Sequence, residues 1–462
     1  MSSAKHDKVQ SQLTRYTCDL TFEKIPPVVV QAAKARIVDT LGVLVSGFDG
    51  EPCKVVRKLA KELDYPGRST ILGTDWKTSL EMAALVNGTT ARYAELTDIY
   101  HWPGSAYGHP SDTIAPIFSV AEHAGASGRE LITAVVLSYE VFCRMSDVFH
   151  NKGFDAVNFG CIATALASAK LLKLSADETA HALSLAAVPN VILKQVRVDN
   201  LTMFKVAAAG HAARAGVFAA LMARAGMEGP HLPFEGKAGW CNHVSLEPLS
   251  FDVMGGEGSD FKLPITGIKY RPCAGNTISS VLAAERIAPL ANPDAVKNIV
   301  VEVYGRAKVA SGTGEHFWAP TTPGTADHSI PYLVAATLIE GTVTHHSFDK
   351  AHLADPNIRA LTNKVSVEEN SEFTIGYESI PVQHRTRVTV TMEDGRIIAG
   401  EAGGDENDLS APRTDAQIDE KFRKLAGAAL GESRTNATLG QLWALQEVAD
   451  VGVIAPGLVV PQ

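Results

Sequence analysis

Apolar residues recur every three or four positions through roughly the first 270 residues of the chain. Between Val29 and Leu41 they stand at intervals of four, which predicts a long helix that begins at the Ile-Pro-Pro segment of residues 25–27. Alanine-rich segments with helical spacing follow at residues 161–170, 180–187 and 206–225. Small side chains let helix backbones approach one another closely, so we expect a helical bundle that is buried on most sides.

The pattern changes near residue 269. Alternating apolar and polar residues predict short strands, and the turn Glu-Asp-Gly-Arg of residues 393–396 joins the last two strands as a hairpin. Stretches with helical spacing lie between the strands. The predicted strands are residues 298–304, 364–368, 386–392 and 397–399, and the predicted helices are about residues 277–289 and 329–341. This order of elements predicts a compact α+β unit.

Helical spacing returns from Thr414 onward, which indicates that the C-terminal segment rejoins the first domain. The sequence therefore predicts a mainly α protein with a large all-helical domain and a smaller inserted α+β domain. We assign residues 1–268 to the first part of the helical domain, residues 269–404 to the α+β domain and residues 405–462 to the closing helices. We expect the inserted domain to act as a lid.

Composition excludes several classes of protein. A chain of 462 residues is too long for one usual core, which agrees with two domains. A net charge of −9 without a long basic run argues against nucleic acid and anionic membranes as partners. The N-terminal segment has no apolar core of a signal peptide, and we find no run of the ~18 apolar residues that a membrane span needs. We expect a cytoplasmic protein.

The six cysteines are scattered along the chain. They stand at positions 18, 53, 143, 161, 241 and 273, with no Cys-x-x-Cys pair. This spacing argues against a disulfide framework and a structural zinc site. An iron–sulfur cluster needs several thiolates at characteristic spacings, and the cysteines of this chain show no such spacing. We therefore expect chemistry without a metal and without a cofactor.

The segment Tyr-Gly-His-Pro-Ser-Asp of residues 107–112 is the first candidate for chemistry. It puts the imidazole of His109 at the start of an apolar helix and close in sequence to Glu95 and Asp98. Such a group takes or gives a proton near neutral pH, and a nearby carboxylate favours its charged form. The competing interpretation is structural, because Pro110 and Ser111 are ordinary first residues of a helix.

Three further segments place polar groups where burial would be costly. They are Phe-Lys-Val at 204–206, Ile-Lys-Tyr-Arg-Pro-Cys at 268–273 and Ala-Asp-His-Ser-Ile-Pro-Tyr at 326–332. Together with the 107–112 segment, and in this order, they resemble the MmgE/PrpD family, which includes 2-methylcitrate dehydratase, cis-aconitate decarboxylase and iminodisuccinate epimerase. The resemblance runs over nearly the whole chain, and it rests on the order and spacing of the segments.

The resemblance implies removal of a proton next to a carboxylate, with loss of a leaving group from the neighbouring carbon. Such a reaction needs a base, an acid and cations that stabilise the developing charge. We expect His109 and Tyr332 to do the acid–base work and Lys205 to act as a catalytic cation. Glu95 and Asp98 stand three positions apart and would share a helix face, where one would be a base and the other would orient His109.

Substrate-binding residues follow from the same resemblance. Lys269 lies where the helical domain gives way to the α+β domain, and Arg197 and Arg271 are candidate forks for carboxylates. Asp155 and Ser111 complete the predicted binding set. For several candidates an ordinary structural role is the competing interpretation. The alternatives are a surface lysine for Lys205, surface arginines for Arg197 and Arg271, a core aromatic residue for Tyr332, and a helix-end charge pair for Glu95 and Asp98. Asp327-His328 looks like a helix cap and loop anchor.

Departures from the family pattern narrow the choice. Asp155 stands where the decarboxylase branch tends to have a histidine, and Ala274 stands where that branch has a histidine after Pro-Cys. Both differences argue against a decarboxylase. Glu95 replaces the usual aspartate, which leaves the identity of the base open among Glu95, Asp98 and His109.

The sequence therefore leaves three candidate functions. The first is a cofactor-independent hydro-lyase that dehydrates 2-methylcitrate or a similar tricarboxylate. The second is another family reaction, a decarboxylase or an epimerase or isomerase of a di- or tricarboxylate. The third is a non-catalytic binding protein on the same scaffold. The implied partner is a small di- or tricarboxylate, and the resemblance implies a homodimer formed through the helical domain.

Overall fold

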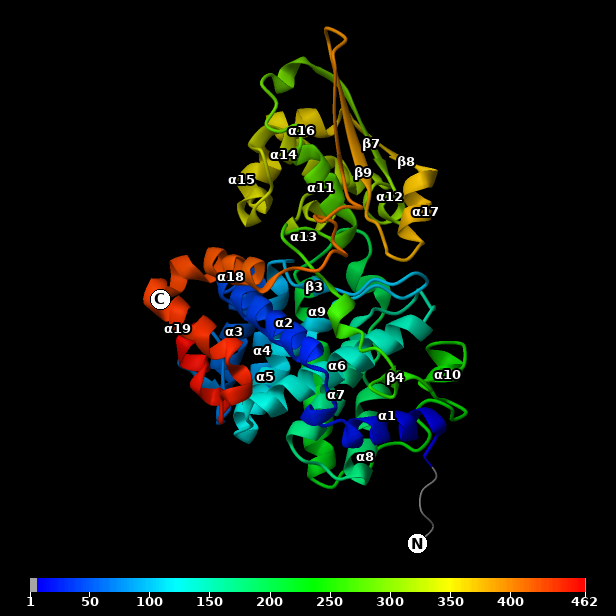
Figure 1. The fold of residues 1–462 in the computed structure, drawn as a ribbon, viewed down its shortest axis with the longest axis vertical. Helices are drawn as coiled ribbons and strands as arrows, with labels where there is room; N and C mark the ends of the chain where they lie inside the picture. Colours follow the sequence, from blue (N-terminus) through cyan, green and yellow to red (C-terminus); the bar gives the residue numbers. More distant parts are fainter. Residues whose placement is uncertain (1–5, 462) are drawn as a thin grey trace.

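The structure, a computed structural model, describes residues 6–461 of the chain. Most of these residues are helical, which confirms a mainly α protein. A large helical body contains the first and last described helices, and a smaller α+β unit, from Ile278 to Ala402, projects from one side of it (Figure 1). The predicted domain bounds at 268/269 and 404/405, and the role of this unit as a lid, stay predictions.

The helical body is built around one large apolar core. Its second helix begins at Pro27, as the Ile-Pro-Pro segment predicts, because proline has a backbone suited to the first turn. The helices of this body are α1 (Lys8–Asp19), α2 (Pro27–Ser46), α3 (Glu51–Leu63), α4 (Leu80–Tyr93), α5 (Ile114–Ala124), α6 (Gly128–Val148), α7 (Val157–Leu171), α8 (Ala176–Ala187), α9 (Phe204–Arg224), α10 (Trp240–His243), α18 (Asp415–Leu430) and α19 (Glu432–Trp443). Helix α18 packs against α2, so this C-terminal helix lies against the helical body.

Small residues let α4 and α9 pack closely. A methyl group added at Gly210 of α9 would meet the carbonyl oxygen of Leu85 at 2.4 Å. Helix α9 also packs against α7 and α8. Contrary to the expectation from the sequence, α9 is long and apolar enough by length and composition to cross a membrane, but 61% of its most apolar stretch is buried inside the protein. Such burial is typical of a core helix.

The α+β unit has a second apolar core, which lies between a four-stranded sheet and its helices. The strands are β7 (Val296–Val303), β8 (Val365–Glu369), β9 (Thr386–Met392) and β10 (Ile397–Ala402), in the order β10-β9-β7-β8. The helices are α11 (Ile278–Glu285), α12 (Gly305–Ser311), α13 (Pro323–Ala326), α14 (Ile330–Glu340), α15 (Lys350–Ala354), α16 (Pro356–Thr362) and α17 (Ser371–Tyr377). All four strands and both helices predicted for this unit are confirmed, within a few residues at their ends.

The sheet is mixed. Strand β9 pairs antiparallel with both β10 and β7, and β7 pairs parallel with β8. Buried and partly exposed residues alternate along β9, so one face of the sheet covers the core. Three two-stranded pairs complete the fold: β1 (Ser69–Thr70) with β2 (Lys77–Thr78), β3 (Asp98–Ile99) with β6 (Gly267–Ile268), and β4 (Met254–Gly255) with β5 (Gly258–Ser259). The β3–β6 pair holds the 95–109 segment close to Lys269.

Candidate active site

A small cavity of about 50 Å³ brings together three of the predicted site residues, His109, Asp155 and Arg197. Both the helical body and the α+β unit contribute to its wall. The lining residues are Arg92, Tyr107, Gly108, His109, Asp112, Phe142, Asp155, Ala156, Val157, Lys194, Arg197 and His328. Seven of these twelve side chains are ionisable Arg, Lys, His or Asp groups, which is an unusual concentration of charge for a nearly closed cavity.

His109 lies directly before a 3₁₀ helix, Pro110–Thr113, that leads into α5. Its Nδ1 is 2.8 Å from the carbonyl oxygen of Asp98. A carbonyl only accepts hydrogen bonds, so Nδ1 carries the proton and Nε2 of the neutral ring is left with a lone pair. That Nε2 is 3.8 Å from Oε1 of Glu95, beyond hydrogen-bonding distance. The ring is therefore oriented as a base.

The charge state of His109 differs from the expectation. Burial, together with the positive charges of Arg92 and Lys269, lowers the pKa of His109 well below its usual value, and the opposing effect of Glu95 is smaller. The imidazole is thus neutral at physiological pH. We expected the nearby carboxylate to favour the charged form, and this was wrong because two cations and the loss of water act in the other direction.

Glu95 is the centre of a buried ion cluster. Arg92 binds it through two hydrogen bonds of 2.6 and 3.0 Å, Lys269 Nζ lies 2.9 Å from Oε1, and Lys205 Nζ lies 3.2 Å from Oε2. Burial opposes ionisation of Glu95, but Arg92, Lys205 and Lys269 outweigh it and lower its pKa well below the usual value. Glu95 is therefore a fixed counter-ion and a poor base.

The expected shared helix face of Glu95 and Asp98 does not exist. Helix α4 ends at Tyr93, Glu95 has a positive φ of 55°, and Asp98 lies in β3. The left-handed backbone at Glu95 turns the chain away from the helix axis. Asp98 instead holds the histidine segment, because its Oδ1 accepts a hydrogen bond of 3.1 Å from the backbone N–H of Ser111.

Lys205 connects the two parts of the protein. Its Nζ lies 3.1 Å from each carboxylate oxygen of Asp327, at the end of α13, and 3.3 Å from Nδ1 of His328. Lys205 is buried, which rules out the competing interpretation of a surface lysine. Asp327 is the C-cap residue of α13, as expected of a helix cap, and Ser329 is the N-cap residue of α14. The Asp327-His328 pair is an anchor for the buried ammonium group.

Lys269 is also fully buried. Besides Glu95, it donates to the carbonyl oxygen of Cys273 at 3.2 Å. Burial lowers the pKa of Lys269, and the negative charge of Glu95 partly restores it. The two predicted lysines therefore converge on one carboxylate from residues far apart in the sequence.

A second cationic group, Arg197 and Lys194, lines the same cavity. Arg197 Nε lies 2.9 Å from Oδ2 of Asp155, and Lys194 Nζ lies 3.1 Å from the same oxygen. Burial opposes ionisation of Asp155, but Arg197 and Lys194 lower its pKa to about 2. Within residues 6–461, the recorded side-chain hydrogen bonds of Arg197 use Nε, and none uses its two terminal nitrogens. These nitrogens are suited to bind a carboxylate.

Two predicted residues, Tyr332 and Arg271, neither line the cavity nor belong to the ion cluster around Glu95. The hydroxyl group of Tyr332 donates to the carbonyl oxygen of Ser347, and its ring belongs to the core of the α+β unit. Arg271 forms a two-pronged ion pair with Glu285, at 2.6 and 2.7 Å. Both side chains have partners that hold them in place, so the structure favours structural roles for them.

Sequence reasoning missed Arg92, Asp112, Tyr107 and Lys194. Arg92 is 1% exposed and binds Glu95 directly. The available signal for Arg92 was a lone cation in an otherwise apolar helix, where burial requires a partner. For Asp112 and Tyr107 the signal was their place in the same segment as His109.

No metal site is apparent in the part of the chain that the structure describes. No group of three or more His, Cys, Asp or Glu side chains there is arranged to hold an ion. All six cysteines are free thiols. Independence from cofactors stays a prediction.

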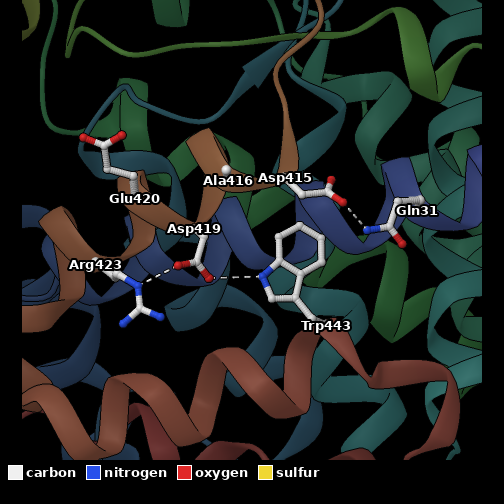
Figure 2. Close-up of a pocket in the computed structure, with 7 residues that line it drawn as sticks. All are labelled: Gln31, Asp415, Ala416, Asp419, Glu420, Arg423 and Trp443. Atoms are coloured by element: carbon white, nitrogen blue, oxygen red, sulfur yellow. Dashed lines mark hydrogen bonds and ion pairs between the residues drawn. The ribbon is translucent and has the colours of Figure 1, made fainter.

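A larger hollow of about 510 Å³ lies on the surface of the helical body beside α2, α18 and α19 (Figure 2). Its Asp419 accepts hydrogen bonds from Arg423 at 2.6 Å and from Trp443 at 3.3 Å. Three carboxylates and one guanidinium group line this hollow, so its charge would repel an anionic substrate. The smaller cavity beside His109 is the better candidate for an active site.

Comparison with known families agrees with the geometry. The MmgE/PrpD N-terminal domain matches residues 11–251, and the MmgE/PrpD C-terminal domain matches residues 272–445. The chain belongs to the MmgE/PrpD family. The resemblance seen in the sequence is thereby confirmed.

Several relatives in this family have names that indicate an activity. A cis-aconitate decarboxylase-like protein, oryM, of Aspergillus oryzae is 24% identical over 97% of this chain and 97% of its own length. The 2-methylcitrate dehydratase of Escherichia coli is 23% identical over 85% of each chain. The human cis-aconitate decarboxylase is 23% identical over 92% of this chain and 89% of its own. Dehydratases and decarboxylases are thus about equally similar to this MmgE/PrpD protein.

Proposed function

We propose that this protein is a cofactor-independent hydro-lyase that removes water from 2-methylcitrate or a similar tricarboxylate. The observation that carries the proposal is the neutral His109, whose Nε2 lone pair is available in a cavity lined by Arg92 and Arg197. A neutral imidazole beside cations is suited to take a proton from carbon next to a carboxylate, because the cations stabilise the charge that develops.

Binding and catalysis divide between the two cationic groups. The terminal nitrogens of Arg197 hold one substrate carboxylate, and Lys194 adds a second positive charge beside it. Arg92, Lys205 and Lys269 surround Glu95 and supply the positive field that lowers the energy of the developing aci-carboxylate. Their positions are fixed before substrate arrives, which reduces reorganisation in the transition state.

Substrate entry requires the site to open. A cavity of about 50 Å³ is far below the ~300 Å³ at which ligand pockets usually begin. The α+β unit contributes His328 to the cavity and Asp327 to the ion pair with Lys205. A movement of this unit away from the helical body would open the cavity, and its return would exclude water. We therefore propose that the α+β unit acts as a lid over the cavity.

A decarboxylase is the second candidate, because oryM and the human enzyme are as similar to this chain as the dehydratases are. Asp155 and Ala274 favour the dehydratase, since they stand where the decarboxylase branch tends to have histidines. Asp155 also neutralises Arg197 and Lys194 rather than offering a proton to substrate.

The test is incubation of the purified protein with citrate, 2-methylcitrate, cis-aconitate and iminodisuccinate. Ultraviolet absorbance reports the conjugated double bond that dehydration forms, and a separate assay detects carbon dioxide. We expect a double bond from 2-methylcitrate or citrate and no carbon dioxide. The His109→Gln variant serves as the control that must be inactive. Carbon dioxide from cis-aconitate would establish the decarboxylase, and no reaction with any of the four would favour a binding protein.

A further inference from the structure

Within the described residues, Asp112 is a buried carboxyl group with no recorded hydrogen bond, and its one recorded ion pair is with Arg92. It lies in the 3₁₀ helix Pro110–Thr113, lines the same cavity as His109 and is 7% exposed. Within residues 6–461, no group donates a hydrogen bond to its carboxyl, and its Oδ1 is wholly buried. The nearest cation is Arg92, whose Nε lies 3.4 Å from Oδ1. A buried carboxylate without hydrogen bonds would be costly, so an acid that keeps its proton fits this place better.

Charged groups of both signs face Asp112. They are Arg92 from α4, Glu95 from the turn after α4, Asp98 from β3 and Arg197 from the 3₁₀ helix Lys194–Arg197. The neutral His109, three residues before Asp112, lines the same cavity. Burial raises the pKa of Asp112 to about 7, with Glu95 and Asp98 adding to the effect and the two arginines opposing it. Asp112 is thus roughly half protonated near neutral pH, unlike Glu95 and Asp155.

Dehydration needs a group that can give a proton. A hydroxide ion is a poor leaving group, and it departs readily only when an acid protonates it. His109 is neutral and carries its one proton on Nδ1, bonded to the carbonyl oxygen of Asp98, so it has no proton to offer the substrate. When the C–H and C–O bonds break in one step, His109 is still accepting its proton, so the acid must be another group that lines the cavity and holds a proton.

Tyr107 is the other candidate. Its hydroxyl is buried without a partner, and its ring packs edge-on against His109. Burial raises the pKa of this phenol above its usual value. The phenol would therefore give up its proton much less readily than a carboxylic acid, which suits a hydrogen-bond donor more than a general acid.

We infer that Asp112 is the general acid that protonates the departing hydroxyl group of the substrate. This inference rests on the proposed hydro-lyase function. Nε2 of His109 takes the proton from carbon, the electron pair of that C–H bond forms the double bond, and the C–O bond breaks. The O–H of Asp112 supplies the proton that turns the leaving group into water. The proton on His109 then returns to Asp112 through solvent, and the site is restored.

The test compares two leaving groups in the Asp112→Asn variant, which keeps the size of the side chain but cannot supply the proton. One substrate is the hydroxy acid that the parent protein dehydrates, and the other is its analogue with chloride in place of the hydroxyl group. Chloride leaves without a proton. We expect the variant to lose about 10²–10⁴-fold in kcat for the hydroxy acid and to stay within a few-fold of the parent for the chloro analogue.

The Asp155→Asn variant is the matched control, since Asp155 lines the same cavity but is held ionised by Arg197. It should impair both substrates alike, mainly through KM. An equal loss for both substrates in Asp112→Asn would overturn the inference, because the residue would then act on structure or binding.

A measurement without turnover separates this inference from the proposed function. Infrared difference spectroscopy of the parent protein should show a carboxylic-acid band that titrates near pH 7, and this band should be missing in Asp112→Asn. A parent protein that shows the band but dehydrates none of the hydroxy acids would refute the hydro-lyase function and leave the protonated Asp112 standing. Absence of the band overturns the inference about Asp112 whatever the substrate.

Discussion

Replacement of Glu95 by glutamine tests whether one carboxylate holds three buried cations together. The side chain keeps its size, but Arg92, Lys205 and Lys269 lose the negative charge that lies 2.6 to 3.2 Å from their nitrogens. Glu95 and all three cations are at most 3% exposed, so water cannot replace the lost charge. We expect a large loss of stability.

The size of the loss follows from two opposing effects. At an effective dielectric constant of about 20, unit charges ~4 Å apart attract each other by roughly 4 kcal/mol, and the cluster has three such pairs. Desolvation of the ions cancels much of this gain, and removal of one partner from a buried ion pair typically costs about 3–5 kcal/mol. We therefore expect the free energy of unfolding to fall by about 3–5 kcal/mol near neutral pH.

The loss should also depend on pH. Burial already lowers the pKa of Lys269 from its usual value, and Glu95 acts in the opposite direction. In Glu95→Gln the pKa of Lys269 falls further below that of the unfolded chain, so the unfolded state binds the proton more strongly. Stability of the variant then rises with pH as Lys269 becomes neutral in the folded state. The difference from the parent should shrink between about pH 6 and about pH 9.

Urea unfolding followed by circular dichroism at both pH values measures the effect. Glu302→Gln is the matched control, because Glu302 pairs with Arg387 in a partly exposed salt bridge of 3.2 Å. Such a pair contributes at most about 1 kcal/mol. A loss for Glu95→Gln that is no larger than that of the control, or that is the same at both pH values, would refute the role of Glu95 as the shared counter-ion.

Four further outcomes are expected. His109→Gln lowers turnover by about 10²–10⁴-fold with an almost unchanged melting temperature, since the structure records one hydrogen bond for its ring; unfolding of the variant would indicate a structural role. Arg197→Met raises KM, whereas Arg271→Met, which loses only the ion pair with Glu285, leaves KM unchanged, and equal effects would contradict the assignment. The pH profile of kcat/KM falls above about pH 7 as Asp112 ionises and extends on the acid side below the usual histidine pKa of ~6.5 because His109 stays neutral; an acid limb at ~6.5 would argue against the low pKa. Turnover survives exhaustive chelation, and its recovery only on addition of a metal would disprove independence from metals.

The sequence alone placed most of the secondary structure. The strands of the α+β unit follow from alternation of apolar and polar residues, and the start of α2 follows from Pro27, because these signals act within a few residues of the chain. Helix α1 was not predicted, and α9 is long and apolar enough for a membrane span although no such segment was expected. The burial of α9 against α4, α7 and α8 results from packing in the helical bundle, and the sequence of α9 alone does not determine it.

The candidate site was likewise predicted only in part from the sequence. The order of its motifs identified the family and led to His109, Lys205 and Lys269, because each motif is a local string of residues. The partners of these groups depend on contacts between distant segments: Glu95 and Lys269 are 174 positions apart, and Lys205 and Asp327 are 122 apart.

Charge states and side-chain directions were decided by the tertiary structure. Burial and neighbouring ions make His109 neutral, hold Glu95 ionised and raise the pKa of Asp112. Packing places the Tyr332 side chain in the apolar core of the α+β unit, although the motif that contains Tyr332 matched the family. Spacing along a chain specifies which residues are present, whereas desolvation and distance, which set their chemistry, arise only when the segments are brought together.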